Sequence, residues 1–305
     1  MKKLEKYQGV FPAFYACYDE KGDVNVDAIK KMTQYFIDKK VQGLYVGGSS
    51  GECIYLSVEE RKKTLEAVME IAKDKLVIIA HVACNNTKDS QELAQHAESL
   101  GVDAIAAIPP IYFKLPDMAI AKYWNDISKD APNTDFIIYN IPQLAGVNLS
   151  INLLKEMVKN KNVIGVKNSS MPVQDIEMFL QNANKDFIVF NGPDEQFISG
   201  LVMGACGGIG GTYAMMPELF LKMYHLIKKG DIKTAQEIQL QVNNVIYKAV
   251  STECNLYAVA KEVIRLQTGI NLGDARPPLF GLNENGKKVA VEVKEMIDQL
   301  LEKYC

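Results

Sequence analysis

The sequence predicts a (β/α)8 TIM barrel followed by a C-terminal extension of three helices, and three observations support this fold class. Short runs rich in Val and Ile alternate eight times with amphipathic segments within about 220 residues, which suits a closed barrel better than an open sheet. These runs are continuously apolar, as expected for parallel strands that are buried on both faces. No G-x-G-x-x-G turn follows the first strand, so an open dinucleotide-binding sheet is disfavoured.

The predicted barrel covers residues 1–230. Its strands are expected at 10–17, 43–46, 76–82, 103–108, 135–139, 163–167, 187–190 and 207–212. Helices are expected after the strands, one of them opening with the capping-box pattern Ser57 to Glu60 and the others near 26–39, 88–100, 117–129, 150–159, 172–182, 194–203 and 216–228. Residues 231–305 show no strand pattern and predict an extension that packs on the barrel, with helices near 231–251, 254–268 and 286–304.

Composition and charge narrow the function classes. The chain has 305 residues, of which 48% are hydrophobic and 23% are charged, as in an ordinary soluble globular protein. The formal net charge of -3 gives no reason to expect a nucleic acid or an anionic membrane as a partner. Neither a signal peptide nor a membrane-spanning run is apparent, so we expect a cytoplasmic location. The cysteines and histidines are scattered without zinc-site spacing, so no metal is expected.

The active sites of such barrels lie at the C-terminal ends of the strands. Lys167 is the most informative candidate, because it stands at such an end. It closes an apolar strand, Val163 to Val166, where limited water favours the uncharged amine. An uncharged lysine amine can attack a carbonyl carbon and form a Schiff base. The alternative is a lysine that reaches solvent or pairs with a carboxylate, and position alone favours that alternative.

Other strand ends carry candidate groups of lower specificity. Tyr139 ends the fifth strand, where its phenol can transfer protons or simply pack at the barrel rim. Ser49 and Ser50 lie in a glycine-flanked turn whose hydroxyls and N–H groups suit a carboxylate, although a tight turn alone would explain them. The glycine run 207–211 either admits a ligand close to the backbone or fits a crowded barrel corner. The convergence of these groups on one rim indicates an active site.

Six motifs occur in order on this strand schedule: G-G-S-S-G-E (47–52), P-P-I-Y (109–112), Y-N-I-P (139–142), G-V-K (165–167), G-G-I-G-G-T-Y (207–213) and R-P-P-L (276–279). In this combination they resemble the N-acetylneuraminate lyase and dihydrodipicolinate synthase superfamily over essentially the whole chain. The resemblance implies a barrel enzyme of the class I pyruvate aldolase type, which binds a keto acid as a Schiff base.

The resemblance also implies roles for individual residues. Lys167 is similar to the Schiff-base lysine of the family, and Tyr139 to its proton-shuttling tyrosine. Ser49 and Ser50 stand where the family binds the keto-acid carboxylate. Tyr112 matches a catalytic tyrosine that neighbouring subunits lend to one another, which implies an oligomer, usually a homotetramer.

Three stretches resemble the lyase branch more than the synthase branch. No arginine follows the Y-N-I-P motif, where synthases use one to hold an amino-acid substrate. Ser169 keeps the hydroxyl that lyases carry after the lysine, and N-G-P-D-E at 191–195 resembles their N-G-x-D-E. This likeness implies a set of residues that orient the polyol part of a sugar acid: Gly48, Ser169, Gly192, Asp194 and Glu195.

Two positions depart from the lyase pattern. Gly211 stands where lyases usually have serine, and Pro193 replaces an aromatic residue beside the acidic pair. Losing one hydroxyl contact at Gly211 would cost on the order of 1 kcal/mol in substrate binding. The substrate is therefore expected to be pyruvate, sialic acid or a related keto sugar acid, with the preferred sugar left open.

The resemblance to the lyase branch implies an enzyme that cleaves N-acetylneuraminate to pyruvate and N-acetylmannosamine. No cofactor is expected, because the imine itself polarises the substrate. A dihydrodipicolinate synthase or another pyruvate-dependent aldolase would use the same imine with a different electrophile. A non-catalytic barrel that binds a keto acid or a sugar is the alternative from another class. A phosphate-sugar enzyme is disfavoured, because Asp194 and Glu195 present carboxylates where a phosphate would need cations.

Overall fold

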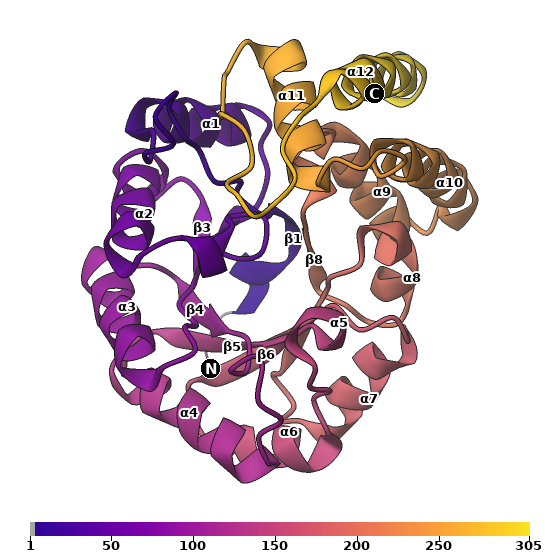
Figure 1. Cartoon of the computed structure of the whole chain (residues 1–305). Helices are drawn as coiled ribbons and strands as arrows, with labels where there is room; N and C mark the ends of the chain where they lie inside the picture. The colour runs from indigo at the N-terminus through magenta and orange to yellow at the C-terminus, as the bar shows by residue number, and fades with distance from the viewer. Residues whose placement is uncertain (1–3) are drawn as a thin grey trace.

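The computed structural model describes residues 4–305, in which eight parallel strands form a single sheet that curves into a barrel (Figure 1). The strands are β1 (Gly9–Pro12), β2 (Gly43–Val46), β3 (Val77–His81), β4 (Ala104–Ala107), β5 (Asp135–Asn140), β6 (Val163–Asn168), β7 (Ile188–Asn191) and β8 (Gly207–Gly210). Neighbours follow the order β1-β8-β7-β6-β5-β4-β3-β2, and a parallel bridge between Ala13 and Tyr45 joins the two ends of this order. The predicted (β/α)8 barrel is confirmed.

Helices surround the sheet, because the amphipathic segment after each strand folds into a helix whose apolar face packs on the strands. They are α1 (Val26–Asp38), α2 (Val58–Ala72), α3 (Thr87–Leu100), α4 (Asp117–Lys129), α6 (Ile151–Met157), α7 (Gln174–Asn182), α8 (Phe197–Val202) and α9 (Pro217–Lys229). The expected capping box is present, because the Ser57 side chain accepts from the backbone of Glu60 and the Glu60 side chain accepts from Ser57. Within residues 4–305, no helix has both the length and the hydropathy needed to cross a bilayer.

The barrel interior is filled by side chains, so a ligand can bind only at one of its ends. The buried interior cluster includes Phe11, Tyr45, Ile79, Ile137 and Phe190. A second and larger apolar cluster fills the space between the sheet and the helices. The strands therefore serve as a rigid support whose C-terminal ends present residues toward one opening.

Three helices follow the barrel: α10 (Ile232–Ala249), α11 (Leu256–Thr268) and α12 (Glu284–Tyr304). Figure 1 shows them in orange and yellow beside α9 and α1, with a loop before α12 that runs back over the barrel. The chain from 231 onward thus lies against the barrel wall and against its C-terminal opening. The division into a catalytic barrel, 1–230, and a helical extension, 231–305, is our proposal for the domain organisation.

The structure differs from the sequence prediction at several element ends. The first strand stops at Pro12 rather than at residue 17, because the chain then leaves the sheet: the N–H of Ala16 donates to Ser50 O at 3.2 Å. The last strand stops at Gly210 rather than at 212, because the Thr212 N–H donates to Asp194 at 2.7 Å. The predicted helix 194–203 begins with a 3-10 turn, and the sequence did not predict the four-residue helix α5 (Pro142–Ala145).

Candidate active site

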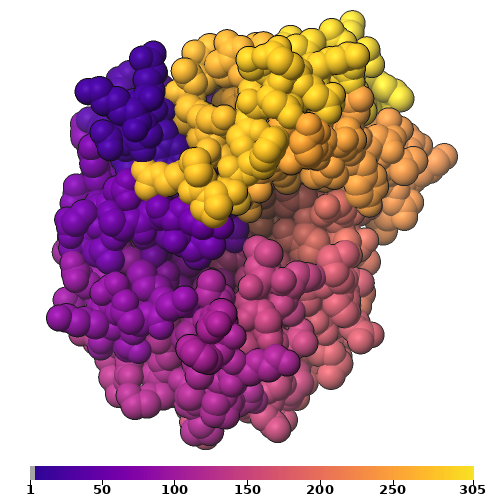
Figure 2. All heavy atoms as spheres, in the orientation of Figure 1, coloured from indigo at the N-terminus to yellow at the C-terminus, as the bar shows by residue number. Residues whose placement is uncertain are grey.

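A cavity of about 340 Å³ opens at the C-terminal ends of the strands. Figure 2 shows the surface of this face hollowed where the extension meets the barrel loops. Nine of the eleven predicted catalytic and binding residues line the cavity: Ser49, Ser50, Tyr139, Lys167, Ser169, Gly192, Asp194, Glu195 and Gly211. These nine predicted residues are up to 162 positions apart, the separation of Ser49 and Gly211, and they meet around one volume.

Lys167 and Tyr139 are held side by side by the sheet. They are register partners on β6 and β5, and their side chains are only 5% and 2% exposed. The Lys167 Nζ lies 3.5 Å from the ring centroid of Tyr139 and 4.6 Å from that of Tyr45. Two aromatic faces thus surround the amine inside the protein, and the phenol of Tyr139 is close enough to exchange protons with groups bound at the amine.

A row of asparagines fixes the strand ends directly beyond this pair. Asn140, Asn168 and Asn191 are register partners on β5, β6 and β7, and all three are buried. Asn140 Nδ2 donates to Asn168 Oδ1 at 2.8 Å, and Asn191 Nδ2 donates to Pro193 O at 2.7 Å. Because these three amides are buried and hydrogen-bonded, Lys167 and Tyr139 project from a rigid edge rather than from mobile loops.

The loop after β2 carries Ser49 and Ser50 and is tied down from two sides. Below it, the buried His81 ring contacts Gly47 O through Nδ1 at 2.9 Å. Burial, followed by the nearby Arg61, lowers the pKa of His81, so the imidazole is neutral at physiological pH. At its end, Glu52 has a left-handed backbone with φ of 52° and forms a buried ion pair with Lys261 of α11. The serines are therefore positioned by the barrel and by the extension together.

Asp194 forms the most strongly perturbed carboxylic acid of the cavity. Its Oδ2 accepts hydrogen bonds from the Thr212 N–H at 2.7 Å and from the Thr212 hydroxyl at 2.5 Å. Burial nevertheless raises the pKa of Asp194 to about 7, because desolvation outweighs the Thr212 bonds and the attraction of Lys167. Asp194 can therefore change its charge near neutral pH.

Gly192 lies on the cavity wall, and its backbone N–H is already used within the protein. That N–H already donates to Asn168 O at 2.7 Å, continuing the β6–β7 pairing. A Cβ at position 192 would come within 2.0 Å of Ser169 Oγ, so only glycine fits this close approach. Gly192 thus makes room for the Ser169 hydroxyl, and its part in orienting a polyol stays a prediction.

Gly48 and Tyr112 are the two predicted residues that do not line the cavity. Gly48 is a buried residue of the serine loop itself, where an added Cβ would meet the Tyr45 ring at 2.6 Å. Tyr112 is 90% exposed with a left-handed φ of 86°, and it packs edge-on against Phe113 at 5.0 Å between ring centroids. Tyr112 therefore lies outside the cavity of its own chain. It can take part in catalysis only at the cavity of another copy of the chain.

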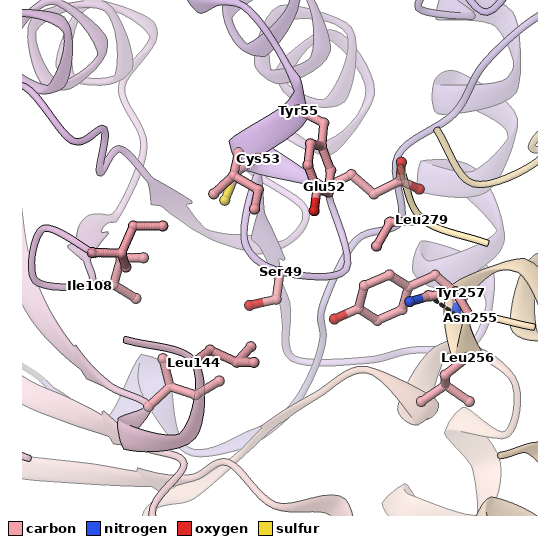
Figure 3. A pocket seen from close by; sticks show the side chains of 13 residues that line it. Ser49, Glu52, Cys53, Tyr55, Ile108, Leu144, Asn255, Leu256, Tyr257 and Leu279 are labelled. Carbon is pink, nitrogen blue, oxygen red and sulfur yellow. Dashed lines mark hydrogen bonds between the residues drawn. The ribbon is translucent and has the colours of Figure 1, made fainter. Parts of the chain in front are cut away.

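A second depression of about 370 Å³ adjoins the cavity and shares several of its residues. Its walls are largely apolar, and they include Ile108, Leu144, Leu279 and the phenol of Tyr257 (Figure 3). Tyr257 lines both hollows, and sequence analysis did not single it out. No motif marks it, because its position depends on how α11 packs against the barrel.

The charges around the cavity define what it can bind. Lys167 is its one basic side chain among residues 4–305, while Asp194 and Glu195 are its acidic ones. The serine hydroxyls can donate hydrogen bonds to a carboxylate beside the lysine, and the acidic pair can accept hydrogen bonds from hydroxyl groups farther along. The arrangement suits a molecule with a keto-acid end and a polyol end.

Comparisons with known proteins agree with this geometry. The model of the dihydrodipicolinate synthetase family matches residues 6–299. The chain is 60% identical over 304 residues to an N-acetylneuraminate lyase of Mediterraneibacter gnavus, covering 100% of this chain and 96% of the relative. A catalytic lysine mutant of a Ruminococcus gnavus sialic acid aldolase matches with a TM-score of 0.99 and 59% identity over 100% of both chains. CdNal from Clostridium difficile, solved in complex with mannosamine, matches with a TM-score of 0.90 and 31% identity, covering 98% of this chain and 99% of that chain.

Proposed function

The chain belongs to the dihydrodipicolinate synthetase family, and on this premise we propose that it is a Schiff-base lyase that cleaves N-acetylneuraminate to pyruvate and N-acetylmannosamine. The observation that carries the proposal is the position of Lys167, a buried amine that lines the cavity against the ring of Tyr139. Relatives named as N-acetylneuraminate lyase and sialic acid aldolase support the reaction, and the solved catalytic lysine mutant supports a lysine as its centre.

The reaction begins with imine formation. In its uncharged form, the Lys167 amine adds to the C2 ketone of open-chain N-acetylneuraminate to give a carbinolamine. The Tyr139 phenol gives its proton to the carbinolamine hydroxyl, which leaves as water, so that an iminium ion and a Tyr139 phenolate remain. The hydroxyls of Ser49 and Ser50 donate hydrogen bonds to the adjacent carboxylate, which fixes the ketone over the amine. The iminium then serves as the electron acceptor, so no metal or organic cofactor is needed.

Carbon–carbon cleavage follows from the position of Tyr139. The Tyr139 phenolate oxygen, formed in the dehydration step, accepts the proton of the C4 hydroxyl while the C3–C4 bond breaks. The electron pair of that bond moves into the iminium to form an enamine. N-acetylmannosamine leaves as the aldehyde. The enamine takes a proton at C3, and water hydrolyses the imine to release pyruvate and the free Lys167 amine.

The polyol end of the substrate is bound by the opposite wall of the cavity. We assign this part to Asp194, Glu195 and the hydroxyl of Ser169, which accept or donate hydrogen bonds to the sugar hydroxyls. Gly211 leaves space beside Ser50, where an added Cβ would lie 3.1 Å from Ser50 Oγ. Selectivity among keto sugar acids is therefore set mainly by the acidic pair.

The test is to incubate the protein with N-acetylneuraminate and to measure pyruvate and N-acetylmannosamine as products. In the reverse direction, pyruvate is offered with either N-acetylmannosamine or aspartate semialdehyde. Condensation with the sugar alone supports the lyase, whereas condensation with the semialdehyde alone identifies a synthase. A protein that binds pyruvate but condenses neither aldehyde is the non-catalytic binding barrel.

We further propose a homotetramer in which Tyr112 of one subunit enters the site of another. Tyr112 is exposed and lies outside the cavity of its own chain, while the apolar second depression beside Ser49 could admit an aromatic ring. Mixing inactive Tyr112→Ala and Lys167→Ala subunits tests this, because a hybrid would combine an intact lysine with an intact tyrosine. Recovered activity supports the exchange, and its absence in verified hybrids contradicts it.

A cytoplasmic location is part of the same proposal, and fractionation of cells that express the native protein tests it.

A further inference from the structure

We propose that Tyr257 is a binding residue for the keto-acid carboxylate, its hydroxyl joining those of Ser49 and Ser50 in one hydrogen-bonding group. This inference rests on the proposed function, because it assigns a further residue to the same site. It would make the C-terminal extension, through α11, a direct part of the active site.

The position of Tyr257 is the first observation. The residue lines both the main cavity and the second depression, and so stands between them. Figure 3 shows its ring entering from the extension, with the hydroxyl directed into the space beside Ser49 and Leu144. The ring reaches the carboxylate end of the cavity, at Ser49 and Ser50.

The second observation is the proximity of Ser50. Tyr257 and Ser50 line the same cavity, and Ser50 is only 4% exposed. Burial raises the pKa of Tyr257 and outweighs the opposing effect of the Ser50 side chain, so the phenol keeps its proton at neutral pH. A protonated phenol in this place can donate a hydrogen bond to an anion.

The third observation is that the ring is held in one orientation. The Asn255 side chain caps α11 by accepting a bond from the Tyr257 N–H at 2.9 Å. One turn later on the same helix, Lys261 pairs with Glu52 of the serine loop at 2.7 Å, with both side chains almost fully buried. Tyr15 packs edge-on against the Tyr257 ring at 5.9 Å between centroids. The helix that carries Tyr257 is thus fixed to the same loop that carries the serines.

The chemistry of the ligand explains why a third hydroxyl is useful. A carboxylate offers about four acceptor positions, and two serine hydroxyls fill only two of them. Gly211, on the other side of Ser50, has no hydroxyl to contribute. The Tyr257 hydroxyl supplies a further donor, and such bonds to charged groups are stronger than bonds between neutral groups.

The test compares wild type with Tyr257→Phe, which removes one oxygen and keeps the ring. Each protein is incubated with increasing pyruvate and reduced with borohydride, and the trapped adduct is measured by mass spectrometry. The same titration uses pyruvamide, a ketone whose neutral amide replaces the carboxylate. The matched control is Tyr123→Phe, which removes a buried hydroxyl bonded to Cys84 O on the barrel wall, away from the cavity.

We expect Tyr257→Phe to raise the half-saturating pyruvate concentration about tenfold, which is the loss of one charge-assisted bond. The half-saturating pyruvamide concentration of Tyr257→Phe should change by less than about twofold. Tyr123→Phe should give the same two concentrations as wild type. Equal pyruvate titrations for wild type and Tyr257→Phe overturn the inference alone. Equal weakening for pyruvate and pyruvamide also overturns it, because it indicates a general distortion. If wild type itself forms no pyruvate adduct, the proposed function fails as well.

Discussion

Breaking the buried ion pair between the extension and the barrel should destabilise the protein strongly. Lys261 Nζ lies 2.7 Å from Glu52 Oε1, and the two side chains are 2% and 0% exposed. In Lys261→Met the Glu52 carboxylate stays buried and loses its counter-ion, a change that typically costs about 3–5 kcal/mol. Glu52 keeps the hydroxyl of Tyr18 at 3.0 Å and the N–H of Arg276 at 2.9 Å as donors. We therefore expect the lower end of that range, about 3 kcal/mol.

The assay is urea or thermal unfolding followed by circular dichroism, at one protein concentration for all variants. A loss of about 3 kcal/mol corresponds to a decrease of about 5 °C in Tm for a chain of this length. The matched control is Lys294→Met, which breaks the partly exposed pair with Asp298 and should cost less than about 1 kcal/mol. The double variant Glu52→Gln/Lys261→Met removes both charges and should recover part of the loss. If Lys261→Met is no less stable than Lys294→Met, the reasoning about this pair is wrong.

Two further predictions concern the cavity. Tyr139→Phe should lower kcat for N-acetylneuraminate cleavage about 10²- to 10⁴-fold with a small change in KM, because it removes the proton acceptor and leaves the groups that hold the carboxylate and the polyol in place. Steady-state kinetics with coupled pyruvate detection measures kcat, and an unchanged kcat contradicts the role of Tyr139. Asp194 has a pKa of about 7 in the folded protein against 3.8 as its ordinary value, so its contribution to stability is fully present below about pH 4 and is lost as the pH rises through 7. Wild type should therefore lose stability relative to Asp194→Asn between pH 4 and 8 in unfolding experiments, and parallel pH profiles for the two proteins would count against this assignment.

The barrel could be predicted from the sequence because its signals are local. Each buried strand reads as a short apolar run, and the capping box at Ser57 marks a helix start without reference to the rest of the chain. The meeting of Lys167 and Tyr139 was also predictable, since both residues lie near the ends of consecutive parallel strands and become register partners. The proximity of these two side chains could therefore be predicted from the strand positions alone, without knowing the conformation of any loop.

The remaining parts of the site depend on contacts between distant segments. Tyr257 and Lys261 reach the serine loop because α11 packs against it, and no local pattern says which helix face turns inward. The bond from the Gly192 N–H to Asn168 O, and the close approach of Gly192 to Ser169, depend on how the segments after β6 and β7 meet, which the sequence does not show. The raised pKa of Asp194 likewise follows from burial that only the assembled cavity imposes.

The central claim is that the Lys167 amine forms a covalent imine with the ketone carbon of pyruvate. The most direct measurement is borohydride reduction in the presence of pyruvate, followed by peptide mapping of the modified residue. We predict a permanent pyruvyl group on Lys167 in wild type, no adduct in Lys167→Ala, and loss of cleavage activity in that variant. An unmodified Lys167, or an adduct on another residue while cleavage proceeds at its normal rate, would contradict the account.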